Sequence, residues 1–108
     1  GHDAHDGDYQ GAVTLKLVPA QSFADHGAYT LTSEVPGLGT YTGYAAVLGK
    51  HMSFYFALSE AGSKDYGTAI ASFAKTRPGK KGKWSFHLYY YEPEYNGGNV
   101  GLEDCVRR

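Results

Sequence analysis

The side chains best suited to recognition in this sequence are tyrosines and histidines that alternate with other residues in apolar stretches. Successive side chains of a strand point to opposite faces, so residues spaced by two share a face. Tyrosine offers a large contact area with a polar tip, which suits both protein interfaces and stacking against sugars. We predict a face that binds a protein or saccharide partner, or a second copy of the chain, made of Tyr44, His51, Tyr55, His87, Tyr89 and Tyr91. The competing interpretation is that tyrosine, a common strand residue, only covers the sheet.

A second feature is a cluster of basic residues beside aromatic ones. Its members are Lys75, Arg77, Lys80, Lys81 and Lys83, followed by the aromatic Trp84 and Phe86. Basic and aromatic side chains together can bind single-stranded nucleic acid through phosphate contacts and base stacking. Charges at a hairpin tip also serve to keep strands from aggregating. We therefore predict a solvated basic tip, with nucleic-acid binding as an alternative.

The first eight residues are rich in histidine and aspartate and contain no apolar side chain larger than alanine. Imidazole and carboxylate groups suit divalent metals, which makes His2 and His5 the candidate metal ligands. A metal site needs several ligands in a fixed geometry, whereas polar chain ends are usually mobile. We therefore predict a flexible N-terminal arm over residues 1–8 without a specific metal site, and a single domain over residues 9–108.

No set of nucleophile, base and orienting acid can be recognised along the chain. The sequence contains no G-x-S-x-G motif and no glycine-rich phosphate loop before a helix. Glu92 and Glu94 fall in a turn-rich run and are predicted to be surface carboxylates. Cys105 is the only cysteine and is expected to be a free thiol. We expect a binding protein without enzymatic activity or a cofactor.

Charge and hydropathy narrow the classes of partner. The 108 residues include 10 basic and 11 acidic side chains, so no overall field attracts the chain to nucleic acid or to an anionic membrane. No run of about 18 apolar residues is present, so no membrane span is expected. The sequence begins with Gly1 instead of methionine, which is typical either of a processed start or of an engineered one in which Gly1 remains from a tag. We therefore predict export, either secretion or a periplasmic location.

Strands are the elements that must position these side chains. Abundant glycine and tyrosine with few helix formers favour short strands and tight turns. Alternation with a period of two predicts seven strands, at about residues 9–18, 28–35, 40–48, 51–59, 66–77, 84–91 and 100–106. The side chains of segment 84–91 that are predicted to face the core are Trp84, Phe86, Leu88 and Tyr90.

Two hairpins have a register that can be predicted. Gly49-Lys50 suits a two-residue type II′ turn, which pairs Val47 with Met52, Ala45 with Phe54 and Gly43 with Phe56. A turn near residues 77–80 is predicted to pair Phe73 with Trp84, Ala71 with Phe86 and Ala69 with Leu88. Small residues then face large ones, which fills the core without overpacking it.

Short connections between successive strands predict an all-β antiparallel meander of seven or eight strands. Closure removes exposed edges, so we expect an up-and-down, calycin-like barrel, with a two-sheet sandwich as the alternative. The segment Gly39–Gly43 (GTYTG) resembles the Gly-x-Tyr hairpins of avidin-type barrels over one strand. Trp84 is the only tryptophan, so the Trp-rich pocket of that family has no counterpart and no site is carried over. A barrel that holds a small apolar ligand in its interior is the alternative function.

Overall fold

The computed structural model describes residues 1–75 and 83–107, and these form an all-β fold with nearly no helix. The strands are β1 (His2–Asp3), β2 (Gly7–Asp8), β3 (Ala12–Leu17), β4 (His26–Val35), β5 (Gly39–Leu48), β6 (His51–Leu58), β7 (Tyr66–Lys75), β8 (Trp84–Glu92) and β9 (Asn99–Val106). Two short 3₁₀ turns are η1 (Pro19–Gln21) and η2 (Tyr95–Gly97). Each of the seven predicted strands is present, within about two residues of its expected ends for most of them.

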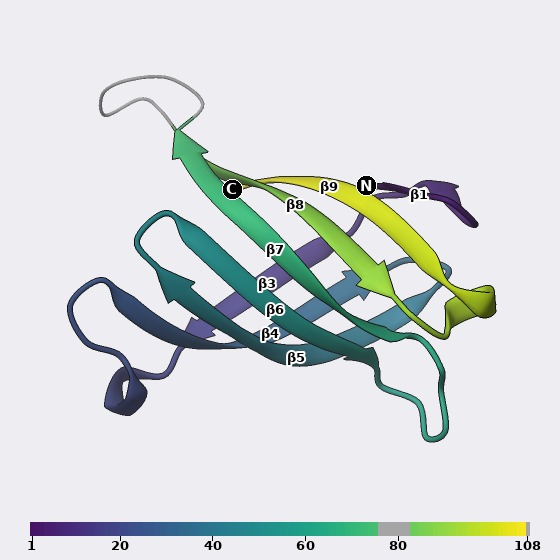
Figure 1. Cartoon of the computed structure of the whole chain (residues 1–108), viewed down its shortest axis with the longest axis horizontal. Coiled ribbons are helices and arrows are strands. Elements are labelled where there is room, and N and C mark those ends of the chain that lie inside the picture. The colour runs from purple at the N-terminus through teal and green to yellow at the C-terminus, as the bar shows by residue number, and fades with distance from the viewer. Residues whose placement is uncertain (76–82, 108) are drawn as a thin grey trace.

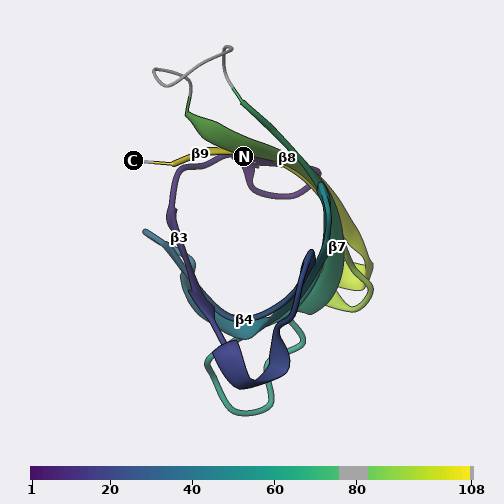
Figure 2. The same cartoon turned by 90° about the vertical axis from the view of Figure 1, so that its left-hand side faces the viewer.

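The strands form one antiparallel sheet in the order β2-β1-β9-β8-β7-β6-β5-β4-β3. Neighbours from β3 to β9 are consecutive in the chain, so the predicted meander is confirmed (Figure 1). The sheet curls strongly on itself: when the molecule is viewed from its end, β4 lies across from β8 and β9, and β3 runs along the side between them (Figure 2). The result is a curled half-barrel with an inner, concave face and an outer, convex face.

The register of the β5–β6 hairpin agrees with the prediction from its turn. Val47 pairs with Met52 and Ala45 with Phe54. Gly49 has φ +59°, while Lys50 is not among the residues with positive φ, the combination expected of a type II′ turn. A Cβ atom at Gly43 would overlap the backbone carbonyl of Tyr55, so only glycine fits at this close approach of the two strands.

The register of the β7–β8 hairpin differs from the prediction by two residues. Phe86 pairs with Phe73 instead of Ala71, and Trp84 pairs with Lys75 instead of Phe73. Because the shift is even, every side chain keeps its predicted face. Trp84 nevertheless lies at the end of the strand and is 44% exposed, so its assignment to the core was wrong.

The core occupies the concave face and follows the predicted alternation. Its buried apolar residues, each 3–6% exposed, are Leu31, Ala45, Met52, Phe54, Ala69, Ala71, Leu88 and Tyr90. Phe73 and Phe86 are half-buried and pack against this cluster, with their ring centroids 5.8 Å apart. The large side chains of β6 and β8 therefore fill the interior opposite the small ones of β5 and β7.

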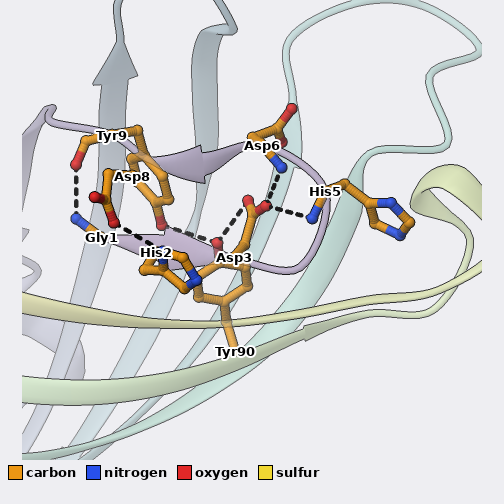
Figure 3. Close-up of polar contacts among 8 residues, drawn as sticks. All are labelled: Gly1, His2, Asp3, His5, Asp6, Asp8, Tyr9 and Tyr90. Carbon is orange, nitrogen blue, oxygen red and sulfur yellow. Dashed lines mark hydrogen bonds and ion pairs between the residues drawn. The ribbon is translucent and has the colours of Figure 1, made fainter.

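Residues 1–8 lie in the sheet instead of forming the flexible arm suggested by their composition. β1 pairs with β9, and β2 pairs with β1. Asp3 is 5% exposed and accepts hydrogen bonds from the backbone N–H groups of His5 and Asp6 and from the hydroxyl of Tyr90 (Figure 3). Because these bonds tie a local turn to β8, the segment is anchored at a point distant in sequence.

Candidate binding surface on the outer face

The described structure places all six residues of the predicted binding face on the convex side of the sheet. Tyr44 comes from β5, two of the others from β6 and three from β8. They alternate with buried neighbours, as in Tyr89 between Leu88 and Tyr90. The exposed members are Tyr44, His51, Tyr55, His87, Tyr89 and Tyr91. Their side chains are therefore available to a partner.

Strand pairing arranges the tyrosines in a row across the sheet. Tyr44 on β5 lies directly opposite Tyr55 on β6. Thr68 on β7 lies opposite Tyr55 on one side and opposite Tyr91 on the other, and Val100 on β9 continues the row beside Tyr91. The rings of Tyr55 and Tyr91 thus stand on either side of the smaller Thr68.

A second row contains aliphatic residues that the sequence reasoning did not single out. It runs from Ser53 through Ile70 and Tyr89 to Leu102. Ile70 is 67% exposed although it lies on a central strand. The available signal was its position between Ala69 and Ala71: two inward-facing neighbours require Ile70 to face outward.

A groove of about 800 Å³ crosses this face. Its lining residues are Gln21, His26, Gly27, Ala28, Ala46, Val47, Leu48, His51, Met52, Ser53, Ile70, Ala71, Ser72, His87 and Tyr89. Small side chains such as Ser53 and Ser72 form its floor, because they sit between the taller Ile70, His51 and His87 in the strand register. None of these described lining residues is Lys, Arg, Asp or Glu, so the groove offers apolar contact and hydrogen bonding without a strong field.

A contact between a histidine and a carboxylate borders the groove on the β9 side. His87 Nδ1 lies 2.7 Å from Asp104 Oδ1, and both side chains are well exposed. An exposed pair of this kind adds little stability. Its effect here is to hold the imidazole toward β9, at the rim of the groove.

The other predicted site residues do not come together as a site. His2 contacts Asp8 at 2.7 Å, whereas the Nε2 atom of His5 lies 2.9 Å from the carbonyl of Gly98. Among residues 1–75 and 83–107, no three His, Cys, Asp or Glu side chains are placed to hold a metal ion.

Most of the predicted basic tip falls outside the described residues. Arg77, Lys80 and Lys81 belong to the segment that the structure does not describe. Lys75 ends β7, and Lys83 is exposed next to the start of β8.

A cluster of carboxylates and tyrosines inside the curl was not anticipated from the sequence. Glu92, predicted to lie on the surface, is 4% exposed, because it continues the inward alternation of β8 past Tyr90. The Nδ2 of Asn99 donates to Glu92 at 2.6 Å, and the hydroxyl of Tyr41 donates to Asp65 at 2.6 Å. Glu94, in contrast, is exposed.

Burial changes the ionisation of this inner cluster. Desolvation, and then the neighbouring Asp65, raise the pKa of Glu92 to about 9. Desolvation and the hydrogen bond to Asp65 also raise the pKa of Tyr41 above its usual range. Burial alone would raise the pKa of Asp3, but hydrogen bonds from Asp6, Tyr90 and His5 outweigh it and hold the pKa below its usual value. At neutral pH, Glu92 is therefore protonated and the tyrosines are hydrogen-bond donors.

Comparisons of the chain with protein-family models, curated proteins and solved structures found no match. In the part of the chain that the structure describes, no helix has the length and apolar character needed to span a membrane. The functional assignment therefore rests on the geometry of the chain itself.

Proposed function

We propose that this protein is a non-catalytic binding protein whose outer face, centred on Tyr55, Ile70 and Tyr89, binds the same face of a second copy. The observation that carries this proposal is the exposure of Ile70, which lies opposite Tyr89 in the row next to the tyrosine row. Contiguous exposed apolar surface is typical of protein contact sites, and tyrosine is enriched at their centres. The aliphatic residues favour a protein partner over a saccharide, because a sugar stacks on aromatic faces and needs polar groups around its hydroxyls.

The charge of the face supports a second copy as the partner. In a two-fold dimer each patch meets itself, so a charged patch would repel its copy. The described lining of the groove contains no lysine, arginine or carboxylate. Each copy also has a groove and, beside it, a ridge of tyrosines. A two-fold axis can place the ridge of one copy against the groove of the other.

Sedimentation velocity over a series of concentrations tests the proposal. The wild-type protein is expected to show reversible dimerisation, and Tyr55→Ser combined with Tyr89→Ser is expected to weaken it by at least about tenfold, as for central interface tyrosines. Leu17→Ser is the matched control, because Leu17 is a half-exposed apolar residue on the edge strand β3. A monomeric wild type at every concentration, or equal weakening by the control, would exclude the proposed dimer.

We also propose that the half-barrel belongs to a closed, calycin-like barrel. The side chain of Tyr9 supports this, since its hydroxyl lies 2.5 Å from Glu103 on β9 while its backbone leads into β3. A cavity of about 210 Å³ between the two ends of the sheet is lined by Val13 on one side and Cys105 on the other. Slow hydrogen exchange of β3 and β9 amides would support closure, whereas rapid exchange of both strands would argue for an open sheet.

Export to the periplasm or outside the cell is also part of the proposed function. Burial first, and then Glu103, raise the pKa of Cys105 to about 12, so the thiol stays protonated and resists oxidation. Such a cysteine is compatible with an oxidising compartment. Fractionation of cells that produce the protein from its own gene tests this, and protein confined to the cytoplasm would oppose it.

Nucleic-acid binding through the basic tip is the remaining alternative. It predicts an affinity that falls steeply with salt and that is lost when Lys80 and Lys81 are replaced by alanine. If a labelled single-stranded oligonucleotide is not shifted at low salt, the alternative is excluded.

A further inference from the structure

We propose that the carboxylate-lined end of the interior binds the ammonium group of a small organic amine, with Asp65 as its principal anion. The site lies on the concave face and is separate from the outer face described above. It differs from a purely apolar pocket because charged and apolar residues share its wall.

The interior cavity has a volume of about 70 Å³. Its apolar wall includes Leu31, Phe54, Phe56, Phe86 and Leu88. Its polar wall includes Asp3, Asp65, Glu92, Glu103, Tyr41 and Tyr90. The lining also includes the exposed Asp6 and the half-buried Leu38, so the cavity reaches the surface at this end of the curl.

Asp65 keeps hydrogen-bonding capacity beyond its bond with Tyr41 and its contact with the protonated Glu92. The residue is 6% exposed, and its Oδ2 accepts the hydroxyl of Tyr41. Its Oδ1 is fully buried and has no hydrogen-bond partner among the described residues. A carboxylate offers about four acceptor positions. Asp65 can therefore accept a hydrogen bond from the neutral Glu92 and another from an N–H donor of a ligand.

No positively charged side chain among the described lining residues compensates this group. The described residues that line the cavity include no lysine, arginine or histidine. Buried anions are costly unless they are paired. A ligand that brings its own positive charge would supply the missing partner.

Aromatic rings stand beside the carboxylates in a way that suits an ammonium group. Phe56 makes edge-on contacts with Tyr41 and Tyr90, with centroid separations of 6.1 Å and 6.0 Å. Ring faces attract cations, and aromatic cages are the common device for binding substituted ammonium groups. The tyrosine hydroxyls point to Asp65 and Asp3, which leaves the rings to contact the ligand.

The size of the cavity limits the ligand to a few heavy atoms. It is about half the volume of the roughly 150 Å³ cavity that accommodates benzene in another protein. Short alkylammonium ions satisfy this limit, and a longer amine would extend past Asp6 to the surface.

Titration of the ¹⁵N-labelled protein with n-propylammonium tests the proposal. The expected result is saturable shifts of the amide signals of Asp65, Tyr90 and Glu92. Two probes with the same number of carbon atoms, 1-propanol and propionate, separate charge from apolar fit. The alcohol is expected to bind at least about tenfold more weakly, since a hydrogen bond between charged groups exceeds a neutral one, and propionate is expected not to bind.

Asp65→Asn removes the charge while keeping an acceptor for Tyr41, and it should weaken n-propylammonium binding by about tenfold or more. Asp104→Asn is the matched control, because Asp104 is an exposed carboxylate on the outer face. Equal affinities for n-propylammonium and 1-propanol would overturn the proposal, and so would an Asp65→Asn protein that binds like the wild type. If Asp65→Asn does not fold, the comparison of the three probes on the wild-type protein still decides the question.

Discussion

Replacing Glu92 by glutamine is expected to stabilise the protein at neutral and alkaline pH. Glu92 is buried beside Asp65, and its pKa is raised from 4.5 to about 9. The glutamine side chain would keep an oxygen for Asn99 and would place an N–H donor toward Asp65. The variant therefore has a hydrogen-bond donor to Asp65 at every pH, whereas the wild type has one only while Glu92 is protonated.

The magnitude follows from proton linkage. Between pH 4.5 and about 9 the folded protein holds a proton on Glu92 that the unfolded chain has released. Wild-type stability therefore falls as pH rises, by about 1.4 kcal/mol per pH unit, or about 3 kcal/mol from pH 6 to pH 8. Glu92→Gln removes this dependence. Asp3 does not interfere, because its lowered pKa affects stability only in acid, below its ordinary value of 3.8.

Urea denaturation at pH 6, 7 and 8 measures this difference through the free energy of unfolding. Glu92→Gln should be more stable than the wild type at pH 8 and should lose that advantage toward pH 5. Glu94→Gln, at an exposed position, is the control and should follow the wild type. A wild-type stability that stays level from pH 6 to 8, with an equal loss in Glu92→Gln at each pH, would show that Glu92 is ionised in the folded protein and would refute the reasoning.

Four further substitutions test the fold, each by its free energy of unfolding. Gly43→Val should cost about 3 kcal/mol or prevent folding, because its Cβ atom would meet the Tyr55 carbonyl; normal stability would mean that the strands lie further apart. Asp3→Ala should cost about 3 kcal/mol, since it leaves the buried Tyr90 hydroxyl without its acceptor. A change below about 0.5 kcal/mol would indicate that residues 1–8 form a free N-terminal arm. Met52→Ala should cost about 2–5 kcal/mol and Ile70→Ala less than about 0.5 kcal/mol. A larger loss from Ile70→Ala than from Met52→Ala would mean that the inner and outer faces of the sheet are assigned the wrong way round.

The alternation of side chains was sufficient to predict the strands and their faces. Met52, Phe54 and Leu88 are buried, whereas Tyr55 and Tyr89 are exposed, because a residue's face depends only on its position along a strand. The two-residue turn at Gly49 also determined the β5–β6 register, since a tight turn leaves no freedom in the pairing.

Other features depend on distances that the sequence does not contain. The register of the β7–β8 hairpin can be predicted only if the length of its connecting loop is known. The alternation of side chains shows whether that length is even or odd, but not its value. The bond between Asp3 and Tyr90 joins residues 87 positions apart, so a short polar segment gave no sign of being buried. Glu92 was assigned to the surface from its turn-rich surroundings, although its place two residues after Tyr90 on the same strand indicated the interior.

The central claim is that the outer faces of two copies meet, and a distance measurement between spin labels tests it most directly. A label at Thr30→Cys lies beside Tyr44 at the margin of the tyrosine row, and a label at Gln10→Cys serves as the control; both variants carry Cys105→Ser. Double electron–electron resonance at a concentration that populates the dimer should give a defined distance between copies at position 30. That signal should disappear when Tyr55 and Tyr89 are replaced by serine. No dipolar coupling at position 30, or the same coupling after those replacements, would contradict the claim.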